Sequence, residues 1–299
     1  MMYLKEIVAI VEDEGCFKEL EQLRGTLPVQ GIELKQWQGT LQSEGIELKL
    51  LQCATQSEGA VPEHEAIGKH RLWMTDSAEC AVLLREQGGA VLAWLHEGNR
   101  NENFTNIPYA CERPAELDAH YFEGVYRRYA GIPWDVTETD RCEIRETVEE
   151  DAAALLAIYE NPQMTQYTEG LHATIEQEKQ YIRDYREKVY GFYGFGIWTI
   201  IEKPTQEIIG RAGFSYREGF EVPELGFAIG VPWQRQGYGE EVCRALLQYA
   251  RDVLAFEEVQ TLVMPENISS IKLCHKLGFK EWGSVKIEGL KYIRFVKGL

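Results

Sequence analysis

Paired cysteines, long apolar runs and an excess of basic residues are all missing from this sequence. Its seven cysteines are scattered without a CxxC pair, which argues against a disulfide framework or a structural zinc site and favours a reducing cytoplasm. No apolar run approaches the ~18 residues needed to span a bilayer. The first residues, MMYLKEIVAIVEDEG, lack the basic stretch of a secretion signal and are expected to form a strand. We therefore expect a cytoplasmic protein.

Acidic residues dominate the charge. The chain has 31 Lys+Arg against 48 Asp+Glu, a formal net charge of -17. Because such a surface repels phosphate backbones and anionic lipid heads, neither nucleic acid nor a membrane is expected as a partner. Residues 1–140 hold 12 basic and 24 acidic residues, a net of -12, so the acidity belongs mainly to the first half.

The length and the periodicity predict an α/β protein of two domains. With 299 residues, 44% of them hydrophobic, the chain is long enough for two cores, and a short polar run after Pro133 separates two periodic stretches. We place the domains at residues 1–138 and 139–299. In the first, strand-like and helical stretches alternate, which predicts a Rossmann-like parallel sheet covered by helices. The expected strands are 7–11, 71–75, 90–95 and 108–111, and the expected helices are 17–23, 76–88 (with Asp76 as its N-cap) and 115–129.

One segment of the first half is duplicated. Residues 24–37 align without gaps on residues 38–51, with eight identities in fourteen positions, and each copy is a glycine turn followed by GIELK. Solenoids normally need three or more repeats of ~20 residues or longer. We therefore interpret the repeat as a local duplication that adds a hairpin or strand at the sheet edge, with a binding surface as the alternative.

In the second half, a glycine loop lies between a predicted strand and a predicted helix. Residues 224–231 are apolar and strand-forming, the loop contains Gln234-x-x-Gly237-x-Gly239, and a helical pattern follows. This order presents backbone N–H groups and the positive end of the helix dipole to an anion, and the glycines let a pyrophosphate approach the main chain. A tight turn without a ligand is the alternative, because neither a Walker loop nor GxGxxG is present.

A second motif lies about 30 residues downstream. A predicted strand over 259–264 precedes N-x-x-S-x-x-x-x-x-K-L-G-F, which begins at Asn267. Asn267 or Ser269 can cap a helix through Lys276, and Gly278 can end it. Together with QRQGYG, this motif resembles the GNAT superfamily of acyl-CoA N-acyltransferases, nearest to its ribosomal-protein N-terminal acetyltransferase branch. The resemblance covers about residues 141–299.

The resemblance implies a GNAT-type α+β domain in which acetyl-CoA lies in a splay between two parallel strands of a mixed sheet. Strands at 143–146, 195–202 and 207–216 and a helix at 151–159 also fit. Main-chain groups of the splayed strand would hold the pantetheine arm, and the loop amides would hold the pyrophosphate. The implied acetyl-CoA-binding residues are Phe227, Ile229, Val231, Arg235, Gln236, Gly237, Tyr238, Gly239, Glu240, Asn267 and Ser270. A solvated loop residue is the alternative for Arg235, and a plain helix cap is the alternative for Asn267.

The resemblance also implies three catalytic groups. Glu224, at the start of the splayed strand, would take the proton from the amine, unless it is a solvated strand-end residue. The main-chain N–H of Ile229 would stabilise the oxyanion. Many members place a tyrosine acid seven residues after the asparagine, and here that position is Cys274. Its thiol could protonate the leaving thiolate, or it could be a small core residue.

An aromatic stretch precedes the central strands. Tyr190, Phe192 and Tyr193 are expected to line the acceptor pocket, or else to form the start of a strand. The predicted activity is transfer of an acetyl group from acetyl-CoA to a primary amine, of a small molecule or a protein N-terminus, by direct attack in a ternary complex and without a metal. The alternatives are a CoA-binding regulatory protein and a phosphate-ester hydrolase in the first half. A homodimer is possible from the sequence.

Polar residues follow two predicted strands of the first half. They are Thr75-Asp76-Ser77 and His96 to Asn99, and ligands of open α/β sheets bind at such strand ends. The stretch faintly resembles HAD-like phosphohydrolases, but their D-x-D motif near the first strand is missing, so we expect a degenerate sensor or docking domain. His96 and Glu97 could hold a metal, and loop hydrogen bonds are the alternative role for them.

Overall fold

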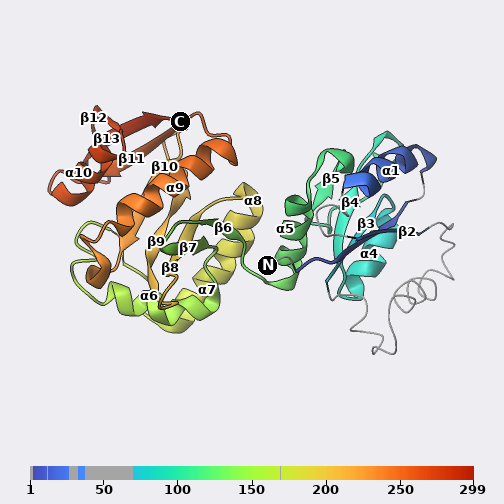
Figure 1. The fold of residues 1–299 in the computed structure, drawn as a ribbon, viewed down its shortest axis with the longest axis horizontal. Helices are drawn as coiled ribbons and strands as arrows, with labels where there is room; N and C mark the ends of the chain where they lie inside the picture. Colours follow the sequence, from blue (N-terminus) through green and yellow to red (C-terminus); the bar gives the residue numbers. More distant parts are fainter. Residues whose placement is uncertain (1–2, 12, 27–32, 38–69, 169) are drawn as a thin grey trace. The chain divides into compact units, whose positions relative to one another are not determined.

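The computed structural model describes residues 3–11, 13–26, 33–37, 70–168 and 170–299. The chain divides into two compact units, Met1–Ile132 and Pro133–Leu299 (Figure 1). The sequence placed the boundary after residue 138, but strand β6 (Asp135–Glu138) pairs with strand β7 (Cys142–Arg145) and therefore belongs to the second unit. Within the described ranges, none of the helices combines the length and apolarity that a bilayer crossing requires.

The first unit is built on a five-stranded sheet in the order β2-β1-β3-β4-β5, in which every pair of neighbours is parallel. This confirms the predicted parallel α/β fold. The elements are β1 (Glu6–Ile10), α1 (Phe17–Thr26), β2 (Glu33–Trp37), β3 (Arg71–Thr75), α4 (Ala78–Glu86), β4 (Ala90–Trp94), β5 (Ala110–Cys111) and α5 (Ala119–Ala130).

Both faces of this sheet are covered, because alternate residues of each strand point to opposite sides. In β1, Ile7 and Ala9 belong to a core with residues of α1 and α5, whereas Val8 and Ile10 belong to a separate core with residues of α4. The central strands β1, β3 and β4 accordingly carry buried apolar residues on both faces rather than on alternate positions. The result is a three-layer arrangement of helix, sheet and helix.

Two details of the first unit differ from the sequence prediction. Ser77, not Asp76, caps α4, since its side chain accepts a hydrogen bond from the N–H of Cys80. Asp76, the residue before Ser77, is buried and accepts a hydrogen bond from the N–H of Asp13 instead. The first copy of the fourteen-residue repeat contributes β2, an edge strand beside β1, and the second copy lies outside the described residues.

The second unit is a mixed eight-stranded sheet in the order β12-β13-β11-β10-β9-β8-β7-β6. Neighbouring strands are antiparallel except β10 and β11, which are parallel, and this confirms the predicted mixed sheet. After β6 and β7 the elements are α6 (Ala152–Tyr159), α7 (Ile175–Tyr185), α8 (Gly191–Tyr193), β8 (Ile197–Glu202), β9 (Ile208–Ser215), β10 (Glu224–Ile229), α9 (Tyr238–Asp252), β11 (Glu258–Val263), α10 (Ile268–Lys276), β12 (Lys280–Ile287) and β13 (Leu290–Gly298).

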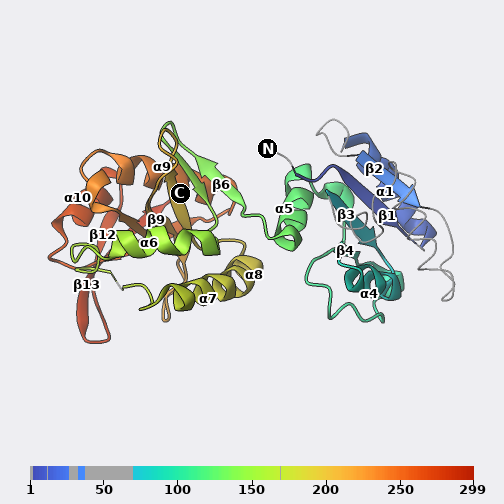
Figure 2. The same ribbon diagram turned by 90° about the horizontal axis from the view of Figure 1, so that it is seen from below.

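Helix α9 supplies much of the core of this unit. Its residues Val242, Leu246 and Ala250 recur at helical spacing and pack with buried residues of the sheet, among them Trp198 and Phe214. Figure 2 shows α6 and α7 on the opposite side of the sheet from α9. This packing fixes the N-terminal end of α9 next to the end of β10, where the sequence predicts the anion site.

Candidate active site

Strands β10 and β11 part after Glu224 and Gln260. Strand β10 pairs along its whole length with β9, but in the described structure it shares a single pair with β11, Glu224 with Gln260. Buried Gln260 fastens this point: its N–H donates to the carbonyl of Pro223 at 2.9 Å, and its Nε2 donates to the carbonyl of Val222 at 2.9 Å. Arg294 on β13 donates to the Oε1 of Gln260 at 2.7 Å. The strands are thus held together before Glu224 and diverge beyond it.

The divergence frees main-chain groups of β10. The N–H of Gly230 donates to the carbonyl of Ile209 on β9 at 2.7 Å. Because successive residues of a strand direct their N–H groups to opposite edges, the N–H groups of Phe227 and Ile229 point away from β9, into the space that β11 leaves. The carbonyl of Ile229 accepts a hydrogen bond from the Nε2 of Gln234 at 2.9 Å. A donor edge for an extended ligand is therefore present where the two motifs predicted it.

The glycine loop leads directly into helix α9. Gly237, with φ +89°, is the N-cap of the helix, and as a glycine it has no side chain that could accept from the first N–H groups. Arg235 also adopts a left-handed conformation, with φ 62°. The first amides of α9 thus stay available to an anion at the positive end of the helix.

Arg141, which the sequence analysis missed, braces this loop. Its Nε donates to Glu241 at 2.7 Å, its Nη1 donates to the carbonyl of Gln236 at 3.1 Å, and its guanidinium lies 4.0 Å from the ring centroid of Tyr238. Burial raises the pKa of Glu241, but hydrogen bonds from Thr139 and Arg141 outweigh it and hold this pKa below its usual value. Arg141 precedes the loop by 95 residues, so no local pattern connects them.

Acidic residues in the first turn of α9 are neutralised. Glu240 forms ion pairs with Lys276 and with Arg244, the latter at 3.0 Å, and hydrogen bonds from these two cations lower its pKa. Glu241 is paired with Arg141. An anion at the loop therefore meets the amides rather than two unpaired carboxylates.

The N–H groups and the loop face one groove of ≈ 610 Å³. Its walls come from the loop after α6, the end of β10, the loop into α9 and the first turns of α10. Eight of the eleven predicted acetyl-CoA residues line it: Phe227, Ile229, Arg235, Gly237, Gly239, Glu240, Asn267 and Ser270. Asn267 is also the N-cap of α10, accepting from the N–H of Ser270 at 3.1 Å. The loop after α6 adds Met164 and Tyr167 to this lining.

Three predicted acetyl-CoA residues are not among those that line the groove. Tyr238 is buried and its hydroxyl donates to Glu202, so its side chain belongs to the core. The Nε2 of Gln236 donates to the carbonyl of Pro232 at 2.7 Å, which closes the loop on itself. Val231 begins a short helical turn after β10. Their side chains shape the loop rather than the groove wall.

Glu224 lies at the point where the strands part. Its side chain is nearly buried and pairs with Arg217, whose Nε lies 2.5 Å from one carboxylate oxygen and whose Nη2 lies 3.4 Å from the other. Glu224 does not line the groove as the structure stands. Arg217, in the loop between β9 and β10, thus holds the carboxylate of Glu224 where the two strands part.

Cys274 lies in the core of the second unit, only 1% exposed, and not in the groove. Burial raises the pKa of its thiol to about 12. A donor this weak, without contact to the groove, is not placed to protonate a leaving thiolate of ordinary acidity. The structure thus favours the alternative of a small core residue.

The three predicted acceptor residues do not gather in one pocket. Tyr190 is 1% exposed, and its hydroxyl donates to the carbonyl of Ile197, so it packs inside the unit. Phe192 is 79% exposed, and Tyr193 packs its ring against Phe195 and Tyr216 with centroids 5.7 Å apart in each pair. Because the stretch is helical rather than extended, neighbouring aromatic side chains point in different directions.

Residues 141–280 match the family described as acetyltransferase (GNAT) domain. The uncharacterized N-acetyltransferase YoaA of Bacillus subtilis (strain 168) is 28% identical over 158 residues, which cover 50% of this chain and 86% of YoaA. The ribosomal protein uS5-alanine N-acetyltransferase of Escherichia coli (strain K12) is 34% identical over 107 residues, covering 35% of this chain and 53% of the enzyme.

A solved structure, the ribosomal-protein-S5-alanine acetyltransferase from Vibrio fischeri, aligns with 56% of this chain and 96% of its own at 18% identity and a TM-score of 0.48. The family match falls on the unit that contains the splayed strands and the glycine loop. Residues 141–280 therefore carry the acetyltransferase (GNAT) domain that the two motifs predict.

Proposed function

We propose that the second unit binds acetyl-CoA in the groove and transfers the acetyl group to a primary amine by direct attack in a ternary complex. The observation that carries the proposal is the parting of β10 from β11 beside the loop of Gly237 and Gly239. Amides of a pantetheine arm fit beside Phe227 and Ile229 as an added strand would, and a pyrophosphate fits the first amides of α9. The groove volume of ≈ 610 Å³ lies within the range of small-molecule sites, about 300–1,000 Å³.

The chain's own groups have distinct parts in this proposal. Acetyl-CoA supplies an activated acetyl thioester. The N–H of Ile229 donates to the acetyl oxygen as negative charge develops there. Glu224 accepts the proton of the attacking ammonium, directly or through one water, and Arg217 orients its carboxylate. The neutral amine nitrogen then bonds to the carbonyl carbon and gives its second proton to solvent, the carbon–sulfur bond breaks, and solvent protonates the thiolate because Cys274 does not line the groove.

The acceptor to test first is the α-amine of a protein or peptide. The support is the relative from Escherichia coli, which is named an alanine N-acetyltransferase of a ribosomal protein. Small-molecule amines form the second class. A cytoplasmic location is part of the proposal, since the six cysteines in the described part of the chain are buried free thiols.

The experiment is calorimetry of the full chain with acetyl-CoA and with CoA, followed by a thiol-release assay. The acceptor panel contains a peptide with an N-terminal alanine, a polyamine and an amino-sugar. We expect saturable binding and release of CoA thiol with at least one acceptor. Absence of binding at millimolar ligand would contradict the proposal. Binding without transfer to any acceptor would support the alternative of a CoA-binding regulatory protein.

A further inference from the structure

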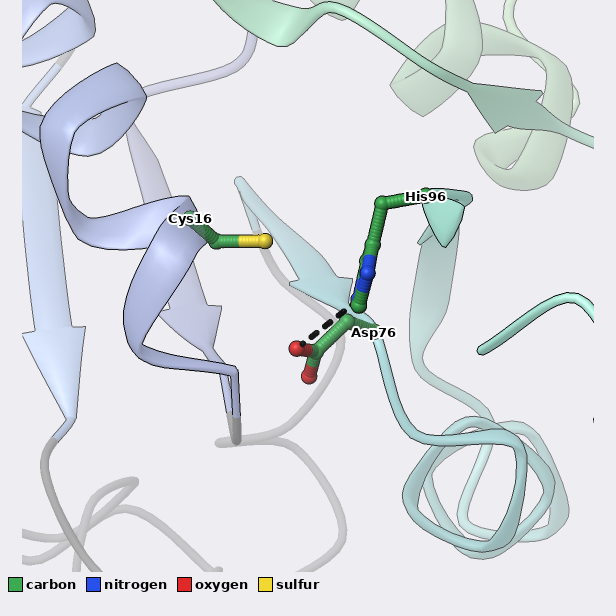
Figure 3. A group of neighbouring side chains, drawn as sticks. All are labelled: Cys16, Asp76 and His96. Atoms are coloured by element: carbon green, nitrogen blue, oxygen red, sulfur yellow. Dashed lines mark ion pairs between the residues drawn. The ribbon is translucent and has the colours of Figure 1, made fainter. Parts of the chain in front are cut away.

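Three side chains of the first unit converge at the carboxyl edge of its parallel sheet (Figure 3). Cys16 lies in the turn after β1, Asp76 directly follows β3, and His96 lies just after β4. These three strands are neighbours in the sheet, so their ends bring residues from distant parts of the chain together. The Sγ, a carboxylate oxygen and a ring nitrogen lie within 4.8 Å of one another.

The ring of His96 is held with one nitrogen facing this Cys16–Asp76–His96 cluster. Its Nδ1 accepts a hydrogen bond from the N–H of Gly98 at 3.1 Å. Its Nε2 is buried, has no hydrogen-bond partner among the described residues, and lies 3.4 Å from the Oδ2 of Asp76. Cys16 and Asp76 are 5% and 3% exposed. The cluster thus presents a sulfur, a nitrogen and an oxygen to one shared, buried point.

Catalysis by a free thiolate does not fit this cluster. Cys16 is 5% exposed and its Sγ lies within 4.8 Å of an Asp76 carboxylate oxygen, whereas a nucleophilic thiolate needs an exposed, electropositive setting. A thiol that coordinates a metal ion, by contrast, is deprotonated by it. A cysteine, a histidine and an aspartate that share one buried point are instead the donor set of a transition-metal ion.

We propose that Cys16, Asp76 and His96 bind a zinc ion. Zinc is borderline-soft and accepts sulfur, imidazole nitrogen and carboxylate oxygen together. With metal–ligand bonds of about 2.0–2.1 Å, the nitrogen and oxygen ligands of a tetrahedral ion lie roughly 3.3–3.4 Å apart. The observed 3.4 Å between Nε2 and Oδ2 matches this spacing. Sγ, now within 4.8 Å of a ring nitrogen of His96 and a carboxylate oxygen of Asp76, would lie about 3.5 Å from both ligand atoms in the zinc-bound site.

Asp13 supports two of the ligands. Its N–H donates to the Oδ2 of Asp76 at 2.9 Å, and its own Oδ2 lies 3.8 Å from the Nδ1 of His96. If Nε2 coordinates the zinc ion, the ring proton of His96 is on Nδ1. This Nδ1–H then donates to the carboxylate of Asp13, and the hydrogen bond that Nδ1 accepts from Gly98 is lost. A carboxylate behind a zinc-bound histidine is the usual outer-shell arrangement.

The site differs from the one considered from the sequence alone. Glu97, with its side chain 92% exposed and 3.7 Å from Arg100, points away from the cluster and is not a ligand. Three protein ligands leave the fourth tetrahedral position to water or a substrate, as in catalytic zinc sites. His96 also lines a groove of ≈ 530 Å³, so a cavity lies beside the cluster.

The test uses the full chain, stripped with a chelator and titrated with Zn²⁺ and, as a spectroscopic probe, Co²⁺. We expect one equivalent of metal per chain, with a thiolate-to-cobalt charge-transfer band and tetrahedral d–d bands. Cys16→Ser should abolish the charge-transfer band, and His96→Gln and Asp76→Asn should abolish stoichiometric binding. Asp13→Asn should weaken binding about 10–100-fold, the usual effect of losing an outer-shell partner.

Cys111→Ser is the matched control, because Cys111 is a buried thiol of the same unit outside the cluster. It should leave the spectrum unchanged. Circular dichroism checks that each variant is folded. If Cys16→Ser fails to fold, the wild-type protein still tests the site. The proposal is wrong if the wild type binds less than one equivalent of metal, or if it binds cobalt without a thiolate-to-cobalt band. Loss of the band in Cys111→Ser would overturn it as well.

Discussion

The two units build their candidate sites from different parts of the polypeptide. In the second unit the groove is lined by main-chain N–H groups, freed where β10 leaves β11 and where Gly237 opens α9. In the first unit the cluster consists of the side chains of Cys16, Asp76 and His96, brought together by three neighbouring parallel strands.

This difference explains why the sequence predicted the first of these sites in detail and the second only in part. A main-chain site depends on glycines at a fixed spacing between a strand and a helix, which is a local pattern. A side-chain site depends on which strands are neighbours, and that is settled by packing. The predictions below test whether the second unit works through its main chain, in order of expected effect.

Glu224 is the general base of the proposed mechanism, a role that main-chain N–H groups cannot fill. Glu224→Gln should lower kcat about 10²–10⁴-fold, the range for loss of a general base, and leave the Kd of acetyl-CoA unchanged. Steady-state kinetics and calorimetry measure the two quantities. Glu221→Gln, at an exposed glutamate nearby, is the control. An unchanged kcat in Glu224→Gln would mean that Glu224 is not the general base.

Substitution of Gly239 tests acetyl-CoA binding without preventing folding. A Cβ there would lie 3.5 Å from Leu273 and 3.7 Å from Ile229, which are ordinary contacts, so Gly239→Ala should fold and gain about 0.5–1 kcal/mol of helix stability. The added methyl group narrows the groove next to the amides, and overpacking costs about 1–3 kcal/mol. The Kd of acetyl-CoA should therefore rise about 5–150-fold by calorimetry, while Gly191→Ala leaves it unchanged. An unaltered Kd would argue against a main-chain phosphate site.

Arg235 tests the contribution of a groove side chain. Asn also tolerates the left-handed conformation, so Arg235→Asn removes the charge without new backbone strain. Because this residue is exposed, we expect a loss of at most about 1 kcal/mol in acetyl-CoA binding, roughly fivefold, that shrinks as salt is added. Calorimetry at two ionic strengths measures it. A larger, salt-independent loss would show that the site depends on this side chain.

The pair of Arg141 and Glu241 gives the loop a pH dependence. The pKa of Glu241 is held below its usual value, so the stabilisation is present above the unfolded pKa of about 4.3 and is lost as the pH falls through the folded pKa. Arg141→Met should lower the free energy of unfolding by at most about 1 kcal/mol at pH 7. Urea denaturation should show this difference vanishing near pH 3. A difference that stays constant with pH would assign the stabilisation to packing.

Cys274 should have the smallest effect on activity. Cys274→Ala removes a buried thiol from the core, so we expect about 1 kcal/mol of lost stability and a kcat within about twofold of wild type. Thermal denaturation and the transfer assay measure these. A loss of activity far beyond the loss of stability would give the thiol a catalytic role.

The sequence predicted most elements of the first unit and the strands and helices around the two motifs, because alternation, helical spacing and capping residues act within a few positions. It did not predict α7, β12 or β13. It also predicted eight groove-lining residues, since they lie on two short motifs. It did not distinguish buried Tyr190 from exposed Phe192, two residues apart on a helical stretch whose orientation depends on its packing.

By itself, then, the sequence determined the local pieces: a strand, a glycine loop and a helix that offers free amides, together with the resemblance these carry. Only the tertiary structure decided how they meet. Gln260 and Arg294 set where β10 leaves β11, Arg141 braces a loop 95 residues away, and the order of three strands brings Cys16 to His96. Backbone preferences depend on immediate neighbours, whereas contacts between distant residues depend on strand order and packing, which no short stretch of sequence contains.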